Sequence, residues 1–66
     1  MSARDLGSQV KRLRESRGLT QQALADAAGV NRVTVANIER GDADPTLATL
    51  KALAKALGVP VATLLR

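Results

Sequence analysis

The four residues Ala28-Gly29-Val30-Asn31 limit the fold of this chain more than any other segment, because they join two helical patterns with almost no linker. Gly29 can adopt the positive φ that so tight a turn requires. Asn31 is a favourable N-cap for the helix that follows. A link of this length makes the second helix cross the first at a steep angle, so the segment predicts a helix-turn-helix unit.

The helices on both sides of this link begin with the same two signals. Thr20 and Asn31 are residue types that cap helix N-termini, because their side-chain oxygens accept bonds from unpaired backbone N–H groups. Each is flanked by apolar residues at the spacing of a hydrophobic staple. The flanking pairs are Leu19 with Leu24 and Val30 with Val35. These repeated signals predict where both helices begin.

Glycine and proline divide the rest of the chain into further helical patterns. The predicted helices span residues 5–17, 21–28, 32–40, 47–57 and 61–65. Gly58 favours a helix end in the left-handed conformation, and Pro60 suits the first position of the last helix. No segment alternates convincingly with the period of two that marks a strand. We therefore predict an all-α fold of five helices, in one domain over residues 1–66.

The composition excludes several classes of function. The chain has no Cys and no His, which removes thiolate metal sites and the commonest general base. We therefore expect no metal, no cofactor, no small-molecule ligand and no enzymatic activity. No apolar run approaches the roughly 20 residues that span a bilayer, and the N-terminus does not resemble a secretory signal, so we expect a cytoplasmic protein without membrane contact. The formal net charge of +4 is compatible with a polyanionic partner, or with a charged surface that serves only solubility.

One side of the helix predicted over residues 32–40 has the chemistry of a DNA-reading surface. At about 100° per residue, Val35, Ile38 and Glu39 cluster toward the core. Polar and small apolar residues cluster on the opposite side. These are Arg32, Val33, Ala36, Asn37 and Arg40. Such a mixture suits a surface laid against base edges in the major groove.

Donor and acceptor chemistry suggests a role for each residue of that side. Arg32 can bind guanine O6 and N7 with two hydrogen bonds, or a phosphate instead. Asn37 can pair with adenine N6 and N7. Val33 and Ala36 can pack against thymine methyl groups. Thr34 lies toward the flank, where a phosphate contact and no contact are equally compatible with the sequence.

Several runs of residues resemble the phage repressor and Cro family, whose members are the lambda-repressor-like, or XRE-type, helix-turn-helix domains. The matching runs are GLTQQALA from Gly18, AGV from Ala28, IERG from Ile38, PTL from Pro45 and LAKALGV from Leu53. The resemblance covers residues 6–65. It implies a five-helix transcriptional regulator, usually a repressor, that binds double-stranded DNA at a palindromic operator as a homodimer. In that arrangement the third helix lies in the major groove.

The resemblance also assigns roles outside the reading side. It makes Gln21 a phosphate contact, at a helix N-terminus where free N–H groups favour an anion. Arg40 and the Gly41 backbone would hold the next phosphate. The resemblance pairs Arg14 with Glu39, which would fix the third helix against the first. Departures from the family pattern are Ala23 in place of a capping Glu, Pro60 in place of Ser, and the acidic Asp42 and Asp44 in a loop near the DNA backbone.

Two alternatives are left open by the sequence. The apolar residues of the last helix can form a dimer surface or complete the core of the monomer. They are Val59, Val61, Leu64 and Leu65. The same fold can also serve as a protein-binding adaptor, of the antitoxin type, with weak DNA binding. The polar face of the third helix favours DNA.

Overall fold

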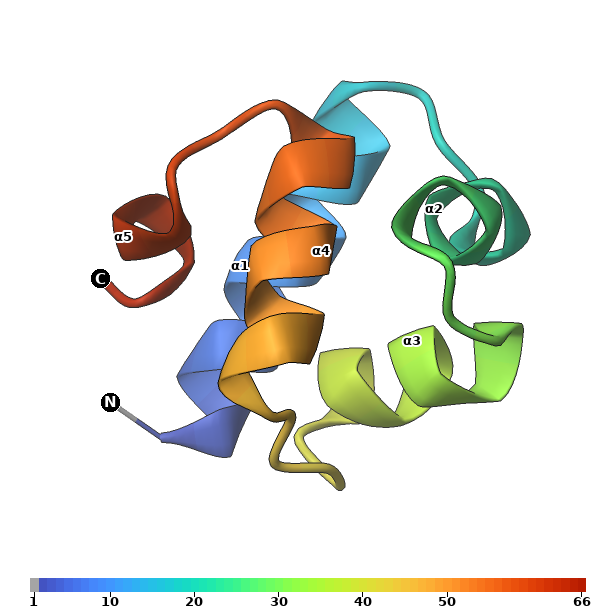
Figure 1. Ribbon diagram of the computed structural model, residues 1–66. Coiled ribbons are helices and arrows are strands. Elements are labelled where there is room, and N and C mark those ends of the chain that lie inside the picture. Colours follow the sequence, from blue (N-terminus) through green and yellow to red (C-terminus); the bar gives the residue numbers. More distant parts are fainter. Residues whose placement is uncertain (1) are drawn as a thin grey trace.

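The computed structural model describes residues 2–66 and has helices at all five predicted places (Figure 1). They are α1 (Ala3–Ser16), α2 (Gln21–Ala28), α3 (Arg32–Arg40), α4 (Leu47–Leu57) and α5 (Val61–Leu64). The prediction of an all-α, five-helix fold is therefore confirmed. The bounds of α2, α3 and α4 are those expected from the sequence. Helix α1 begins earlier than expected, at Ala3, and α1 and α5 each end one residue sooner than expected.

The helix starts are fixed by side-chain caps. The hydroxyl of Thr20 accepts from the Ala23 backbone N–H at 3.0 Å, and Asn31 Oδ1 accepts from that of Thr34 at 2.9 Å. The early start of α1 has the same cause, because Ser2 Oγ accepts from the Asp5 N–H at 3.2 Å. A cap of this kind satisfies a backbone donor that the helix itself leaves unpaired.

Pro60 differs from its predicted position. It is the N-cap of α5, with extended backbone angles of φ −64° and ψ 150°, and the helix begins at Val61. Its side chain makes no capping hydrogen bond. The fixed φ of proline is compatible with both positions, so ψ decides between them, and the sequence does not specify ψ.

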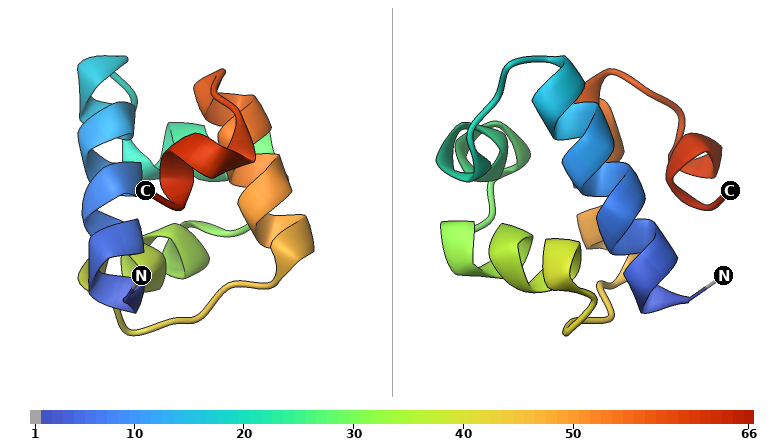
Figure 2. Two further views of the ribbon diagram at one scale, coloured as in Figure 1. Left: turned by 90° about the vertical axis from the view of Figure 1, so that its left-hand side faces the viewer. Right: turned by 180° about the vertical axis from the view of Figure 1, so that it is seen from behind.

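The helices are arranged around a purely aliphatic core. Helices α1 and α4 lie in the middle, with α2 and α3 on one side and α5 on the other (Figures 1 and 2). All five helices contribute buried residues. The core residues are Leu6, Val10, Leu13, Leu24, Ala25, Val35, Ile38, Leu53, Ala54, Leu57 and Leu64. No helix within residues 2–66 is long and apolar enough to cross a membrane.

Leu64 is part of this core and has no exposed surface. For this residue the structure decides between the two alternatives left open by the sequence: Leu64 completes the monomer and is not a dimer contact. Helix α5 is also attached to α1, because Gln9 Nε2 donates to the Thr63 carbonyl at 3.2 Å.

Helix α3 is held very close to α1 at Gly7. A Cβ placed on Gly7 would lie 2.7 Å from the carbonyl oxygen of Glu39 and nearer still to that of Ile38. Real Cβ atoms do not approach backbone oxygens so closely. A glycine at this position is what allows the C-terminal end of α3 to reach α1.

Candidate DNA-binding surface

A buried ion pair attaches the back of α3 to α1. Arg14 Nε donates to Glu39 Oε2 at 2.7 Å, and Arg14 Nη2 donates to Oε1 at 3.1 Å. The two side chains are only 11% and 4% exposed. Arg14 Nη1 also donates to the Leu19 carbonyl at 2.6 Å, so the same guanidinium reaches the start of the helix-turn-helix unit.

The hydrogen bond to Glu39 raises the pKa of Arg14, against the opposing effect of burial. A cation whose pKa is raised by folding stabilises the fold fully below its unfolded pKa, and this contribution is lost only as the pH rises through the folded pKa. The ordinary pKa of arginine is already above the physiological range. Arg14 therefore stays charged at every pH at which DNA binding would be measured.

Gln21 belongs to the same network. Its Nε2 donates to Glu39 Oε1 at 3.2 Å, so the first residue of α2 is attached to α3. The sequence assigned Gln21 to a phosphate contact. The structure places the Gln21 amide beside Glu39. Because Gln21 is the first residue of α2, this bond orders the N-terminus of α2, and a helix N-terminus favours an anion such as phosphate.

The outward side of α3 presents four of the five residues expected there. Arg32 and Arg40 are exposed, Asn37 is half-buried, and Val33 is 53% exposed. None of the ion pairs recorded among residues 2–66 involves Arg32. These four residues are called the reading face below.

Ala36 was expected on the reading face but is buried, with 8% of its surface exposed. It lies about 100° around the helix from Val35. Helix α3 packs against α1 and α2, and neighbours on two sides cover more of a helix than a single core-facing stripe. Little of Ala36 is thus accessible to a thymine methyl group, and that contact stays a prediction.

The predicted phosphate contacts Thr34 and Gly41 already have partners within the chain. The Thr34 hydroxyl is 3.3 Å from Asn31 Oδ1. Gly41 has a φ of 79° and ends α3, and its N–H donates to the Ile38 carbonyl at 3.0 Å. That N–H is therefore occupied in closing the helix, and the phosphate contact of the Gly41 backbone stays a prediction.

Arg40 is bonded on two sides. Its Nε donates to Asp42 Oδ2 at 3.1 Å, and its Nη2 donates to Asn37 Oδ1. The side chains of Arg40 and Asp42 are 60% and 64% exposed. This chain of contacts was not predicted from the sequence. The spacing of three residues between Asn37 and Arg40 is a signal that could have suggested it, since such residues are neighbours on a helix surface.

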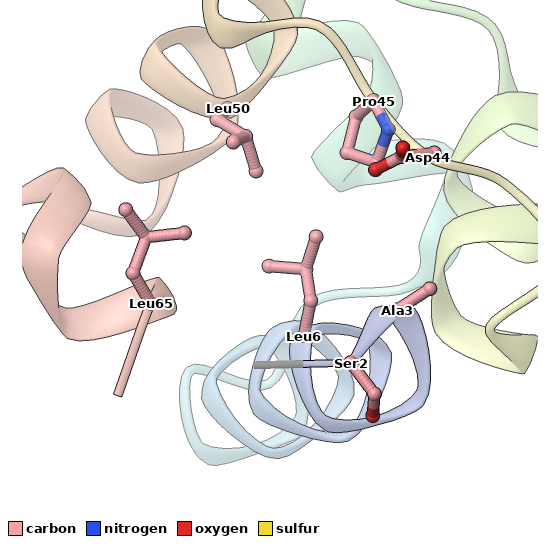
Figure 3. A pocket seen from close by; sticks show the side chains of 7 residues that line it. All are labelled: Ser2, Ala3, Leu6, Asp44, Pro45, Leu50 and Leu65. Atoms are coloured by element: carbon pink, nitrogen blue, oxygen red, sulfur yellow. The ribbon is translucent and has the colours of Figure 1, made fainter.

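The residues proposed for a dimer surface lie away from the reading face. Val59 and Val61 are half-buried, and Leu65 is 47% exposed. Leu65, Leu6 and Leu50 point into one shallow pocket of about 140 Å³ between α1, α4 and α5 (Figure 3). The pocket is lined by Ser2, Ala3, Leu6, Asp44, Pro45, Leu50 and Leu65.

Comparison with known proteins agrees with this architecture. Residues 10–64 match the helix-turn-helix family. The chain is 43% identical over 61 residues to the HTH-type transcriptional regulator SutR of Escherichia coli (strain K12), which covers 92% of this chain and 34% of that protein. It is 42% identical over 59 residues to the immunity repressor protein of Bacillus phage phi105, covering 89% and 41% respectively. The chain thus spans well under half the length of these curated relatives.

The fold is also similar to a solved structure. The restriction-modification controller protein C.AhdI from Aeromonas hydrophila superposes with a TM-score of 0.92 at 32% identity, over 94% of each chain. The sequence match and the fold match cover the same helices, including the α2–α3 unit and the reading face. The chain therefore belongs to the helix-turn-helix family.

Proposed function

We propose that this chain binds a specific double-stranded DNA site with α3 in the major groove, and represses transcription from it. The observation that carries the proposal is the division of α3 into two sides. Its back is fixed by the buried Arg14–Glu39 pair, while its front exposes cationic and amide donors. A rigid helix with such a front suits the major groove, where bases differ in their donors and acceptors.

Each residue of the reading face has a role in this proposal. Arg32, in the first turn of α3, donates to guanine O6 and N7 or to a phosphate. Val33 packs against a thymine methyl group, and Asn37 bonds to a base edge. Gln21, Thr34 and Arg40 meet phosphates on either side of the groove, where contacts fix the register of the protein on the duplex.

The operator is proposed to be a palindrome bound by a homodimer. Two copies of α3 would then lie about 34 Å apart, one turn of DNA. The exposed Leu65 and the pocket beside it support a dimer surface formed by α5, with Val59 and Val61 at its margin. Leu64 takes no part because it is buried.

Selection from a pool of random DNA tests the proposal. The recovered sequence and a scrambled control are titrated with the protein at two salt concentrations. Recovery of a palindrome, bound at least about a thousandfold more tightly than the control and with an affinity that falls with salt, is the expected result. If no sequence is enriched and both DNAs bind equally weakly, the proposal is wrong and a protein-binding adaptor takes its place.

The dimer surface is tested separately with matched leucines. Leu65 and Leu47 are both about half exposed; Leu65 directly follows α5, and Leu47 begins α4. Leu65→Gln should shift the sedimentation of the protein–DNA complex toward one protomer per duplex, whereas Leu47→Gln should not. Equal behaviour of the two variants would place the dimer contact elsewhere.

A further inference from the structure

The contact between Arg40 and Asn37 fixes the orientation of the Asn37 amide. Nη2 of Arg40 donates to Asn37 Oδ1. The oxygen and nitrogen of an asparagine amide are often hard to tell apart, but here chemistry distinguishes them. A guanidinium has donors only, so the Asn37 atom that faces it must be the oxygen.

This orientation determines what Asn37 offers to a base. Its carbonyl oxygen is directed to Arg40, and its NH2 group, for which no bond is recorded among residues 2–66, is directed away. Several N–H groups of Arg40 have no recorded partner either, since its two bonds use Nε and one hydrogen of Nη2. Together the two side chains present donors and positive charge.

Bases differ in how well they suit such a surface. Adenine offers one acceptor, N7, and one donor, N6, so pairing with asparagine needs the amide oxygen as well as the NH2 group. Guanine offers two acceptors, O6 and N7. Guanine offers an acceptor to each of two donors on this positively charged surface, whereas adenine offers one acceptor and would place its N6 donor at the second lone pair of Asn37 Oδ1, beside the Arg40 cation.

We propose that Asn37 and Arg40 act as one unit that reads guanine, in place of the adenine that asparagine alone would favour and of a phosphate contact by Arg40. This inference rests on the proposed function, because it concerns the same DNA-binding surface. Asp42 is a positioning residue in this unit, since its carboxylate accepts from Arg40 Nε at 3.1 Å while Nη2 donates to Asn37. The base preference at Asn37 is thus strengthened by Asp42, which lies in the loop after α3.

The test uses four duplexes that differ at a single base pair. That base pair is the one at which the wild-type protein has a preference that Asn37→Ala abolishes. We expect the wild type to favour guanine over adenine there by about tenfold. Arg40→Met frees the Asn37 oxygen, so the ratio should fall to one or invert in favour of adenine. Thermal melting monitors the fold of each variant. Because Arg40 is exposed, its substitution should leave the fold intact.

Two aspartates of the same loop provide the matched controls. Asp42→Asn weakens the hold on Arg40 and should reduce the guanine preference about two- to threefold. Asp44→Asn removes the same charge, and the ion pair to Arg40 is recorded from Asp42, so the preference should not change. Equal effects of the two variants would contradict a positioning role for Asp42.

The outcomes separate this inference from the function on which it rests. A wild-type preference for adenine at the Asn37-dependent base pair, or a guanine preference that Arg40→Met leaves unchanged, overturns the inference while specific DNA binding stands. Equal binding of all DNA by the wild type overturns the proposed function itself.

Discussion

Two adjacent residues of α3, Glu39 and Arg40, each take part in an arginine–carboxylate pair. One pair is buried and the other is exposed. Glu39 points inward to Arg14, with side chains 4% and 11% exposed, and Arg40 points outward to Asp42, with side chains 60% and 64% exposed. The chemistry of the two pairs is the same. Access to water differs, and so does the consequence of breaking each pair.

The buried pair stabilises the fold, and the exposed pair is accessible to DNA. Removing one partner of a buried pair leaves an uncompensated charge where water cannot reach it. An exposed pair contributes little to stability, because water and salt screen both of its charges. The N–H groups that Arg40 does not use for Asn37 and Asp42 can therefore bond to DNA, whereas those of the buried Arg14 cannot.

The largest effect should follow from breaking the buried pair. Arg14→Met leaves Glu39 with only its bond from Gln21, and we expect a loss of about 3–5 kcal/mol in the free energy of unfolding. Urea denaturation measures it. Arg12→Met is the control, because Arg12 is exposed on the same helix and bonds only to Gln9 nearby. A loss below about 1 kcal/mol would mean that Glu39 gains access to water.

The next largest effect concerns the closeness of α1 to α3. Gly7→Ala places a Cβ against the carbonyl oxygens that end α3, so the helices must separate, at a cost of about 1–3 kcal/mol. The same separation would lengthen the Arg14–Glu39 contact. Ser8 is the next residue along α1 and is exposed, so Ser8→Ala should leave the unfolding midpoint unchanged. Equal midpoints for both variants would contradict the close approach.

On the outward side, changes should affect binding more than folding. Asn37→Ala should relax discrimination at one base pair by about 1–3 kcal/mol. Gln21→Ala should weaken binding to all sequences about equally, because it acts on the phosphate-facing end of α2. Titration of operator variants measures both. A uniform loss from both substitutions would show that Asn37 does not read a base.

The smallest effect on stability should come from the exposed pair. Arg40→Gln should change the free energy of unfolding by no more than about 0.5 kcal/mol. The same substitution should lower DNA affinity and reduce the slope of log affinity against log salt by about one, because it removes one positive charge from the side of α3 that would face DNA. Destabilisation comparable to that of Arg14→Met would remove the distinction between the two pairs.

The sequence predicted most of the fold because its helix signals are local. Thr20, Asn31 and Gly29 act within one turn of chain, and the bounds of α2 and α3 follow from them. The start of α1 was misplaced although Ser2 is an equally local signal, because Ser2 and Ala3, one turn before Leu6, include no large apolar residue that would suggest a helix there.

The site was less predictable because its details depend on tertiary contacts. Helical periodicity gives the angle of Ala36 but not the neighbours on both flanks that bury it. The same limit applies to Leu64, whose apolar character suits a core and an interface equally. The contacts of Arg40 with Asn37 and Asp42 depend on rotamers and on the path of the loop, neither of which a residue pattern specifies.

Chemical-shift mapping tests most directly whether DNA binds at α3. Backbone amide spectra of the ¹⁵N-labelled protein are compared with and without the selected duplex. We expect the largest chemical-shift changes at the start of α2 and along the reading face, at Gln21, Arg32, Val33, Asn37 and Arg40. The outer side of α1, at Lys11 and Arg12, should change little. Changes concentrated on α1 or α5, with the reading face unperturbed, would contradict the assignment of DNA binding to α3.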